Sequence, residues 1–127
     1  MLKKSILWSV PLLLALVVML TLSSTVPTQA TEQDPVVAWQ KIDSGVMIID
    51  VRSAEEFSSG HINGAINIPF DQIVPALAKL DLAKDTDLVL YCHSGRRSGI
   101  AQSALVDQGY SHTYNAGGFD ALMSSRK

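Results

Sequence analysis

The sequence has one cysteine among its 127 residues, and this scarcity excludes two kinds of chemistry. A single thiol cannot form an intramolecular disulfide, and the absence of a C-x-x-C pair excludes dithiol exchange of the thioredoxin type. Cys92 is therefore a buried inert side chain, one half of an intermolecular bridge, or a reactive thiol. The count alone leaves these three interpretations open, so the residues around Cys92 must distinguish them.

Basic residues and metal-binding patterns are also scarce. Ten Lys and Arg are outnumbered by twelve Asp and Glu, which gives a net charge of −2 at pH 7, whereas a nucleic-acid-binding domain needs a basic face. Walker A and dinucleotide-binding glycine motifs are absent. The three histidines share no ligand spacing, so we expect no metal site. The composition thus argues against nucleic acids as partners.

The N-terminus has the features of a targeting segment. MLKK is positively charged, and the stretch SILWSVPLLLALVVMLTL that follows is almost wholly apolar. Small and polar residues then lead to Thr28-Gln29-Ala30, which is typical of a cleavage site. We predict a signal peptide over residues 1–30. The alternative is an uncleaved membrane anchor, because the apolar stretch approaches the length of a span.

Cleavage would leave one domain, residues 31–127, with 8 basic and 12 acidic residues and a net charge of −4. In it, apolar runs that predict strands alternate with stretches that predict helices. The predicted strands cover 46–51, 65–68, 88–92 and part of 112–118. The predicted helices cover 36–42, a short segment after Ser53, 71–80, about 95–108 and 119–123. This alternation indicates an α/β fold with a small parallel β-sheet flanked by helices on both faces.

Cys92 ends the apolar run LVLYC, at the edge of the predicted sheet where such folds bind ligands. The turn after it contains Gly95, which permits a tight bend that aims successive N–H groups inward. The next helix contributes the partial positive charge of its N-terminus, and Arg96 and Arg97 add two cations. These features favour an anion at the centre of the loop. A thiolate there would have a pKa below the usual value of about 8.5.

Three segments together carry a resemblance to a known family. DVRSAEEFSSGHINGAINIP, YCHSGRRSG and NAGG resemble the corresponding segments of single-domain rhodaneses, which are thiosulfate sulfurtransferases. With a predicted signal peptide in front, the chain looks most like the small periplasmic rhodaneses of the phage-shock type. The resemblance extends from about Val36 to Met123 and implies a rhodanese domain over residues 31–127, located in the periplasm.

The resemblance also implies a mechanism and a set of site residues. Cys92 would attack thiosulfate, carry the transferred sulfur as a persulfide and pass it to cyanide or a thiol, with release of sulfite. Substrate and persulfide would be bound by the loop residues His93, Ser94, Gly95, Arg96, Arg97 and Ser98. Arg97 would bind the sulfonate end of thiosulfate or orient the loop, and which arginine matters more is open. No cofactor or metal is implied, and we expect a monomer.

Two other functions are compatible with parts of this pattern. A non-catalytic sulfur-carrier or binding module would keep the loop without turnover, although the intact Cys92 and both arginines argue against it. A cysteine-based phosphatase or arsenate reductase is the second alternative. Related phosphatases use a longer C-x5-R loop, whereas here the arginines stand at C-x3-R and C-x4-R. A shorter ring suits a sulfur atom better than a phosphoryl group.

Overall fold

The computed structural model describes residues 32–126, so the predicted signal peptide lies outside the described residues. Its centre is a parallel four-stranded sheet with the strand order β2-β1-β3-β4. The strands are β1 (Met47–Asp50), β2 (Ile66–Asn67), β3 (Leu88–Cys92) and β4 (Thr113–Gly118). The helices are α1 (Pro35–Asp43), α2 (Ala54–Ser58), the 3-10 turn η1 (Phe70–Gln72), α3 (Ile73–Leu80), α4 (Arg96–Asp107) and α5 (Phe119–Ser124).

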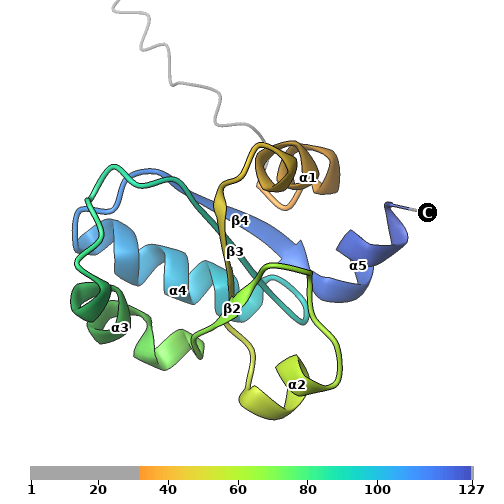
Figure 1. Ribbon diagram of the computed structural model, residues 1–127, viewed down its shortest axis with the longest axis horizontal. Coiled ribbons are helices and arrows are strands. Elements are labelled where there is room, and N and C mark those ends of the chain that lie inside the picture. Colours follow the sequence, from red (N-terminus) through yellow and green to blue (C-terminus); the bar gives the residue numbers. More distant parts are fainter. Residues whose placement is uncertain (1–31, 127) are drawn as a thin grey trace, which may run out of the picture.

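Helices cover both faces of the sheet, as the sequence predicts (Figure 1). The helices α3 and α4 lie on one face, and α1 and α5 lie on the other. Successive side chains of a strand point to opposite faces, so β3 contributes to two cores. Leu90 and Cys92 pack in the core beneath α3 and α4, whereas Val89 and Tyr91 pack in the core beneath α1 and α5. Cys92 therefore faces the helix that begins directly after its own loop.

Two helix starts follow from local sequence signals. The Asp34 carboxylate accepts a hydrogen bond from the Val36 N–H at 2.9 Å, with Pro35 at the first position of α1. Before α2, the Ser53 hydroxyl accepts from the Glu56 N–H, and the Glu56 carboxylate accepts from the Ser53 N–H, each at 3.2 Å. This reciprocal pair is the capping box that the S-x-x-E spacing predicts.

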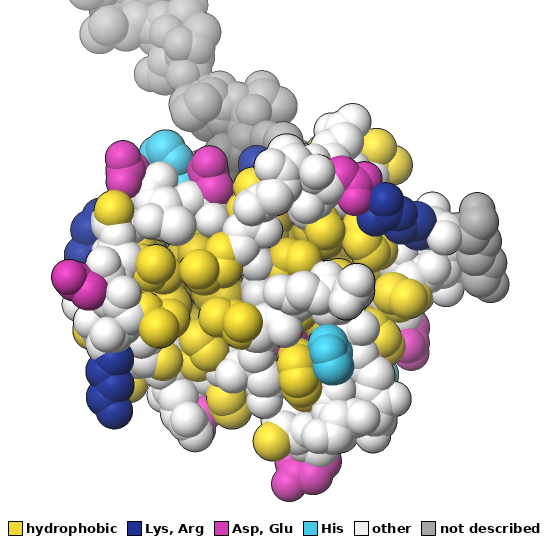
Figure 2. Space-filling view, in the orientation of Figure 1, with side chains coloured by type: hydrophobic (Ala, Val, Ile, Leu, Met, Phe, Trp, Pro, Cys, Tyr) yellow, Lys and Arg dark blue, Asp and Glu magenta, His cyan; other side chains and the backbone are white. Residues whose placement is uncertain are grey.

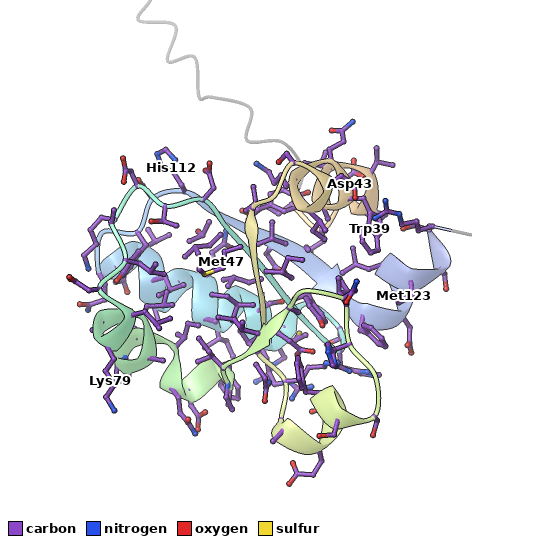
Figure 3. The ribbon with its side chains drawn as sticks, viewed as in Figure 1. Trp39, Asp43, Met47, Lys79, His112 and Met123 are labelled. Carbon is purple, nitrogen blue, oxygen red and sulfur yellow. The ribbon has the colours of Figure 1, made fainter. Side chains whose placement is uncertain are left out.

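Some side chains on the surface of the fold are hydrophobic. On the face shown in Figure 2, such side chains gather between α3 and α1. Ile66, on the edge strand β2, is 39% exposed. Trp39 lies at the contact between α1 and α5 (Figure 3), where its indole N–H donates to the Leu122 carbonyl at 3.0 Å. None of the helices within residues 32–126 is long and apolar enough to cross a bilayer.

Candidate active site

The site lies at the carboxyl end of β3, where a short turn joins Cys92 to α4. Gly95 precedes the helix with a φ of +92°, a left-handed conformation that glycine adopts without strain. The end of β4 approaches this turn closely, because a Cβ added at Gly118 would overlap the backbone carbonyl oxygen of His93. A side chain at Gly118 would therefore displace the loop, and one at Gly95 would be strained by the positive φ.

Donors of the loop surround the sulfur of Cys92. The Gly95 N–H donates to Sγ at 3.0 Å, and the Ser98 hydroxyl lies 3.4 Å from Sγ. The backbone N–H groups of Ser94 and Ser98 also favour the ionised form of this sulfur. The inward-facing amides that the glycine turn predicts are thus present around the thiol.

These donors change the acidity of the thiol. Burial opposes ionisation of Cys92, but hydrogen bonds from the Ser98 hydroxyl and from the N–H groups of Ser98, Ser94 and Gly95 outweigh it. The pKa of Cys92 is therefore lowered from its ordinary value. A thiol with a lowered pKa supplies more thiolate at neutral pH, which is the form that acts as a nucleophile.

Cys92 is fully buried, which its position at the end of a strand does not by itself predict. Its side chain occupies the floor of the loop, in contact with the core beneath α3 and α4. The sulfur of a substrate is larger than a water molecule, so it reaches Sγ only when neighbouring atoms move. By contrast, His93, Ser94 and Arg96 are exposed on the outer side of the loop.

The two arginines have different surroundings. The Arg97 guanidinium donates to both carboxylate oxygens of Glu56 on α2, at 2.7 and 2.9 Å. This pairing lowers the pKa of Glu56 to about 2, with burial opposing and hydrogen bonds from Ser53 assisting. Arg96 is exposed and forms no ion pair with the residues that the structure describes. Arg97 therefore connects α4 to α2, whereas Arg96 faces solvent.

The sequence analysis did not predict the pairing of Glu56 with Arg97. The two residues are 41 positions apart, and no local pattern connects them. A second charged pair lies nearby. Asp50 and Arg52 form a buried salt bridge of 2.6 Å at the end of β1. Arg52 also donates to the Gly60 carbonyl at 2.7 Å, so it fixes the segment after α2.

Asn115 is a second residue that the sequence did not single out. It is buried on β4, and its side-chain oxygen accepts from the Ser98 hydroxyl at 2.7 Å and from the Gly117 N–H at 3.0 Å. Its side-chain N–H donates to the Gly95 carbonyl at 3.0 Å. The alternation of side chains along the strand could have indicated its position. Tyr114 and Ala116 face the core beneath α1 and α5, so Asn115 between them faces α4.

The remaining histidines lie away from the sulfur. The His61 ring forms a 2.9 Å hydrogen bond with the Phe57 carbonyl and stacks on the Phe57 ring. His112 is exposed beside Asp87. Within residues 32–126, no group of three His, Cys, Asp or Glu side chains could hold a metal ion.

Comparisons with known proteins agree with this geometry. The family model described as "Rhodanese-like domain" matches residues 34–125. The thiosulfate sulfurtransferase PspE of Escherichia coli is 41% identical over 70 residues, which cover 55% of this chain and 67% of that protein. The thiosulfate sulfurtransferase GlpE of Pseudomonas savastanoi is 38% identical over 79 residues, 61% of this chain and 73% of that protein.

A likeness in three dimensions adds to these matches. A solved structure of a rhodanese with anions from E. coli superposes with a TM-score of 0.56 at 39% identity, and it covers 58% of this chain and 87% of that one. The family match includes both the loop after Cys92 and the whole sheet that positions it. The chain therefore belongs to the rhodanese-like domain family.

Proposed function

We propose that the protein is a thiosulfate sulfurtransferase that carries sulfur as a persulfide on Cys92. Membership of a family whose similar members are named thiosulfate sulfurtransferases supports sulfur transfer in general. The observation that carries the specific proposal is the set of donors around Sγ, with the Gly95 N–H at 3.0 Å. Donors aimed at a sulfur atom stabilise negative charge both on a thiolate and on a persulfide.

In the first half-reaction, the Cys92 thiolate attacks the outer sulfur of thiosulfate. A bond forms between Sγ and that sulfur, the sulfur–sulfur bond of thiosulfate breaks, and sulfite leaves with the electron pair. In the second half-reaction, cyanide or a thiolate attacks the outer sulfur of the persulfide. Cys92 leaves as a thiolate, so no oxidant, reductant or cofactor is consumed. The lowered pKa of the thiol favours its ionised form, and once Cys92 is ionised the attack needs no separate general base.

The two arginines are proposed to have separate roles. Arg96 is exposed and unpaired among the described residues, so its guanidinium is available to the sulfonate group of thiosulfate. Arg97 is engaged by Glu56 and orients the first turn of α4. We expect Arg96→Ala to raise the KM for thiosulfate with little change in kcat. Arg97→Ala should lower kcat as well, because it releases the loop. If both substitutions raised KM equally and left kcat unchanged, this division of roles would be contradicted.

Mass spectrometry tests the covalent step directly. Incubation with thiosulfate should add roughly 32 Da, one sulfur atom, to the protein, and cyanide should remove it. Cys92→Ser should abolish both the adduct and the transfer to cyanide, whereas Ser94→Ala, which keeps the backbone N–H, should retain the adduct. An adduct that forms but never turns over with any thiol would identify a sulfur carrier. Hydrolysis of p-nitrophenyl phosphate would identify a phosphatase.

We also propose that residues 1–30 are removed on export to the periplasm and that the mature domain is a monomer. The charged, apolar and small-residue segments of the N-terminus support export. Expression of the full chain should yield a periplasmic protein whose N-terminal sequence begins at Thr31, with the mass of one chain by light scattering. Retention of Met1 in the membrane fraction would identify an anchor instead.

A further inference from the structure

The hydrogen bonds of Asn115 fix the orientation of its side-chain amide. The Gly117 N–H can only donate, so the atom 3.0 Å from it must be the amide oxygen. The Gly95 carbonyl can only accept, so the atom 3.0 Å from it must be the amide nitrogen. The oxygen that lies 2.7 Å from the Ser98 hydroxyl is therefore an acceptor, and the hydroxyl must supply the proton between them.

Ser98 has only one hydroxyl proton but two acceptors within reach. The Asn115 oxygen is 2.7 Å away, and the sulfur of the fully buried Cys92 is 3.4 Å away. A hydroxyl carries one donor and two acceptor lone pairs. It can therefore donate to Asn115 while it accepts from a Cys92 S–H, or it can donate to a Cys92 thiolate, but it cannot do both.

In both arrangements the Cys92 sulfur, the Ser98 hydroxyl and the Asn115 oxygen each keep a hydrogen-bond partner. When Cys92 is a thiol, its S–H donates to Ser98, and the Ser98 hydroxyl donates to Asn115. When Cys92 is a thiolate, the hydroxyl turns to the sulfur, and the Asn115 oxygen keeps the Gly117 N–H as its donor. An unsatisfied buried donor or acceptor is destabilising, so the second donor on the Asn115 oxygen is what permits the turn.

We infer that Asn115 is a positioning residue for Cys92: it holds the Ser98 hydroxyl while the sulfur is neutral and releases it when the sulfur becomes an anion. The thiol proton passes to a base in solution, and no other bond is formed or broken as the hydroxyl rotates. The same side chain holds the Gly95 carbonyl, so the carbonyl does not turn toward the sulfur. This role rests on the proposed function of Cys92 as a nucleophile.

Several charged or titratable groups face the site from the neighbouring elements. They are Asp50 and Arg52 at the end of β1, Glu56 on α2, and His93, Arg96 and Arg97 around the loop, whereas the Tyr91 side chain lies on the opposite face of the sheet. Asp50 and Glu56 are each paired with an arginine. His93 is the histidine of the loop, and its side chain is exposed. The measurement below is therefore repeated in His93→Gln.

NMR of the wild-type domain tests the inference without altering Asn115. As the pH rises through the ionisation of Cys92, the hydroxyl leaves the Asn115 oxygen, and the Gly117 N–H becomes the only donor to it. The Gly117 amide proton should therefore move downfield with the midpoint measured for Cys92 by iodoacetamide alkylation. In Ser98→Ala the same charge develops but no hydroxyl turns, so this movement should be lost. Its absence in the wild type, or its persistence in Ser98→Ala, would overturn the inference.

A double-mutant cycle gives an independent test. Asn115→Asp places a stronger acceptor beside Ser98 and adds a negative charge, so it should raise the midpoint of Cys92 alkylation. In a Ser98→Ala background the charge and the lost hydrogen bond to the Gly95 carbonyl still act but the hydroxyl does not, so the same substitution should raise the midpoint by less. Equal increases in both backgrounds would show that Asn115 does not act through the hydroxyl. Neither test measures sulfur transfer. The role of Asn115 and the proposed sulfur transfer are therefore confirmed or refuted by separate measurements.

Discussion

The ion pair between Glu56 and Arg97 gives a quantitative prediction, because one substitution isolates it. Glutamine satisfies the S-x-x-Q form of a capping box, so Glu56→Gln should keep the cap of α2 and remove only the charge that Arg97 contacts at 2.7 and 2.9 Å. The variant therefore measures how strongly α2 and α4 are held together across the active-site loop.

The size of the effect follows from the lowered pKa of Glu56. A change from 4.5 to about 2 corresponds to a ceiling of about 3 kcal/mol, at roughly 1.4 kcal/mol per pKa unit. The Glu56 side chain is 34% exposed and that of Arg97 is 26% exposed. Screening by solvent therefore reduces the ceiling, and we expect Glu56→Gln to lower the free energy of unfolding by about 1 kcal/mol at pH 7.

The pH dependence has a definite sign. The pKa of Glu56 is lower in the folded state, so its stabilisation is fully present above pH 4.5 and is lost as the pH falls toward 2. Urea unfolding of wild type and Glu56→Gln should differ at pH 7 and converge near pH 2. Glu55→Gln is the matched control, since Glu55 lies in the same first turn and is exposed. A difference that stays constant down to pH 2, or an equal loss in Glu55→Gln, would refute the reasoning.

Three further predictions concern the buried pair, the close backbone contact and the thiol. Asp50→Ala leaves a buried arginine without its 2.6 Å partner and should cost about 3–5 kcal/mol in urea unfolding. Asp43→Ala, which breaks a half-exposed pair, should cost less than about 1 kcal/mol. Gly118→Ala would overlap a loop carbonyl and should cost about 1–3 kcal/mol. Gly45→Ala, which meets open space but has a positive φ, should cost about 1–2 kcal/mol. Alkylation of Cys92 should reach half its maximal rate at a lower pH than alkylation of a free cysteine, because the loop lowers its pKa.

Local patterns predicted the elements of the fold well. The run of apolar residues from Leu88 to Cys92 became a strand with those same bounds, because a polar connection and a glycine turn limit it. The strand predicted at 65–68 is shorter, since only Ile66 and Asn67 pair with β1. The helix predicted from residue 71 begins at Ile73, because a 3-10 turn precedes it.

Contacts between distant segments could not be predicted in this way. The sequence indicated donors around Cys92, since a glycine turn and a helix start are local features. It did not indicate that Glu56 would pair with Arg97, or that Asn115 would reach Ser98 and Gly95. These partners meet only because the parallel sheet brings the ends of its strands to one edge. Their spacing in the chain follows no period.

The irregular pairing of β3 and β4 has a consequence for engineering. Leu90 lies opposite Asn115, but Cys92 lies opposite Gly118, so β4 carries one extra residue at this point. That insertion brings both an amide side chain and a bare backbone against the turn after the cysteine. If residues 92–98 alone were moved into another scaffold, the loop would thus lack the contacts that β4 makes with it. A functional graft would have to include the stretch from 115 to 118 with its offset intact.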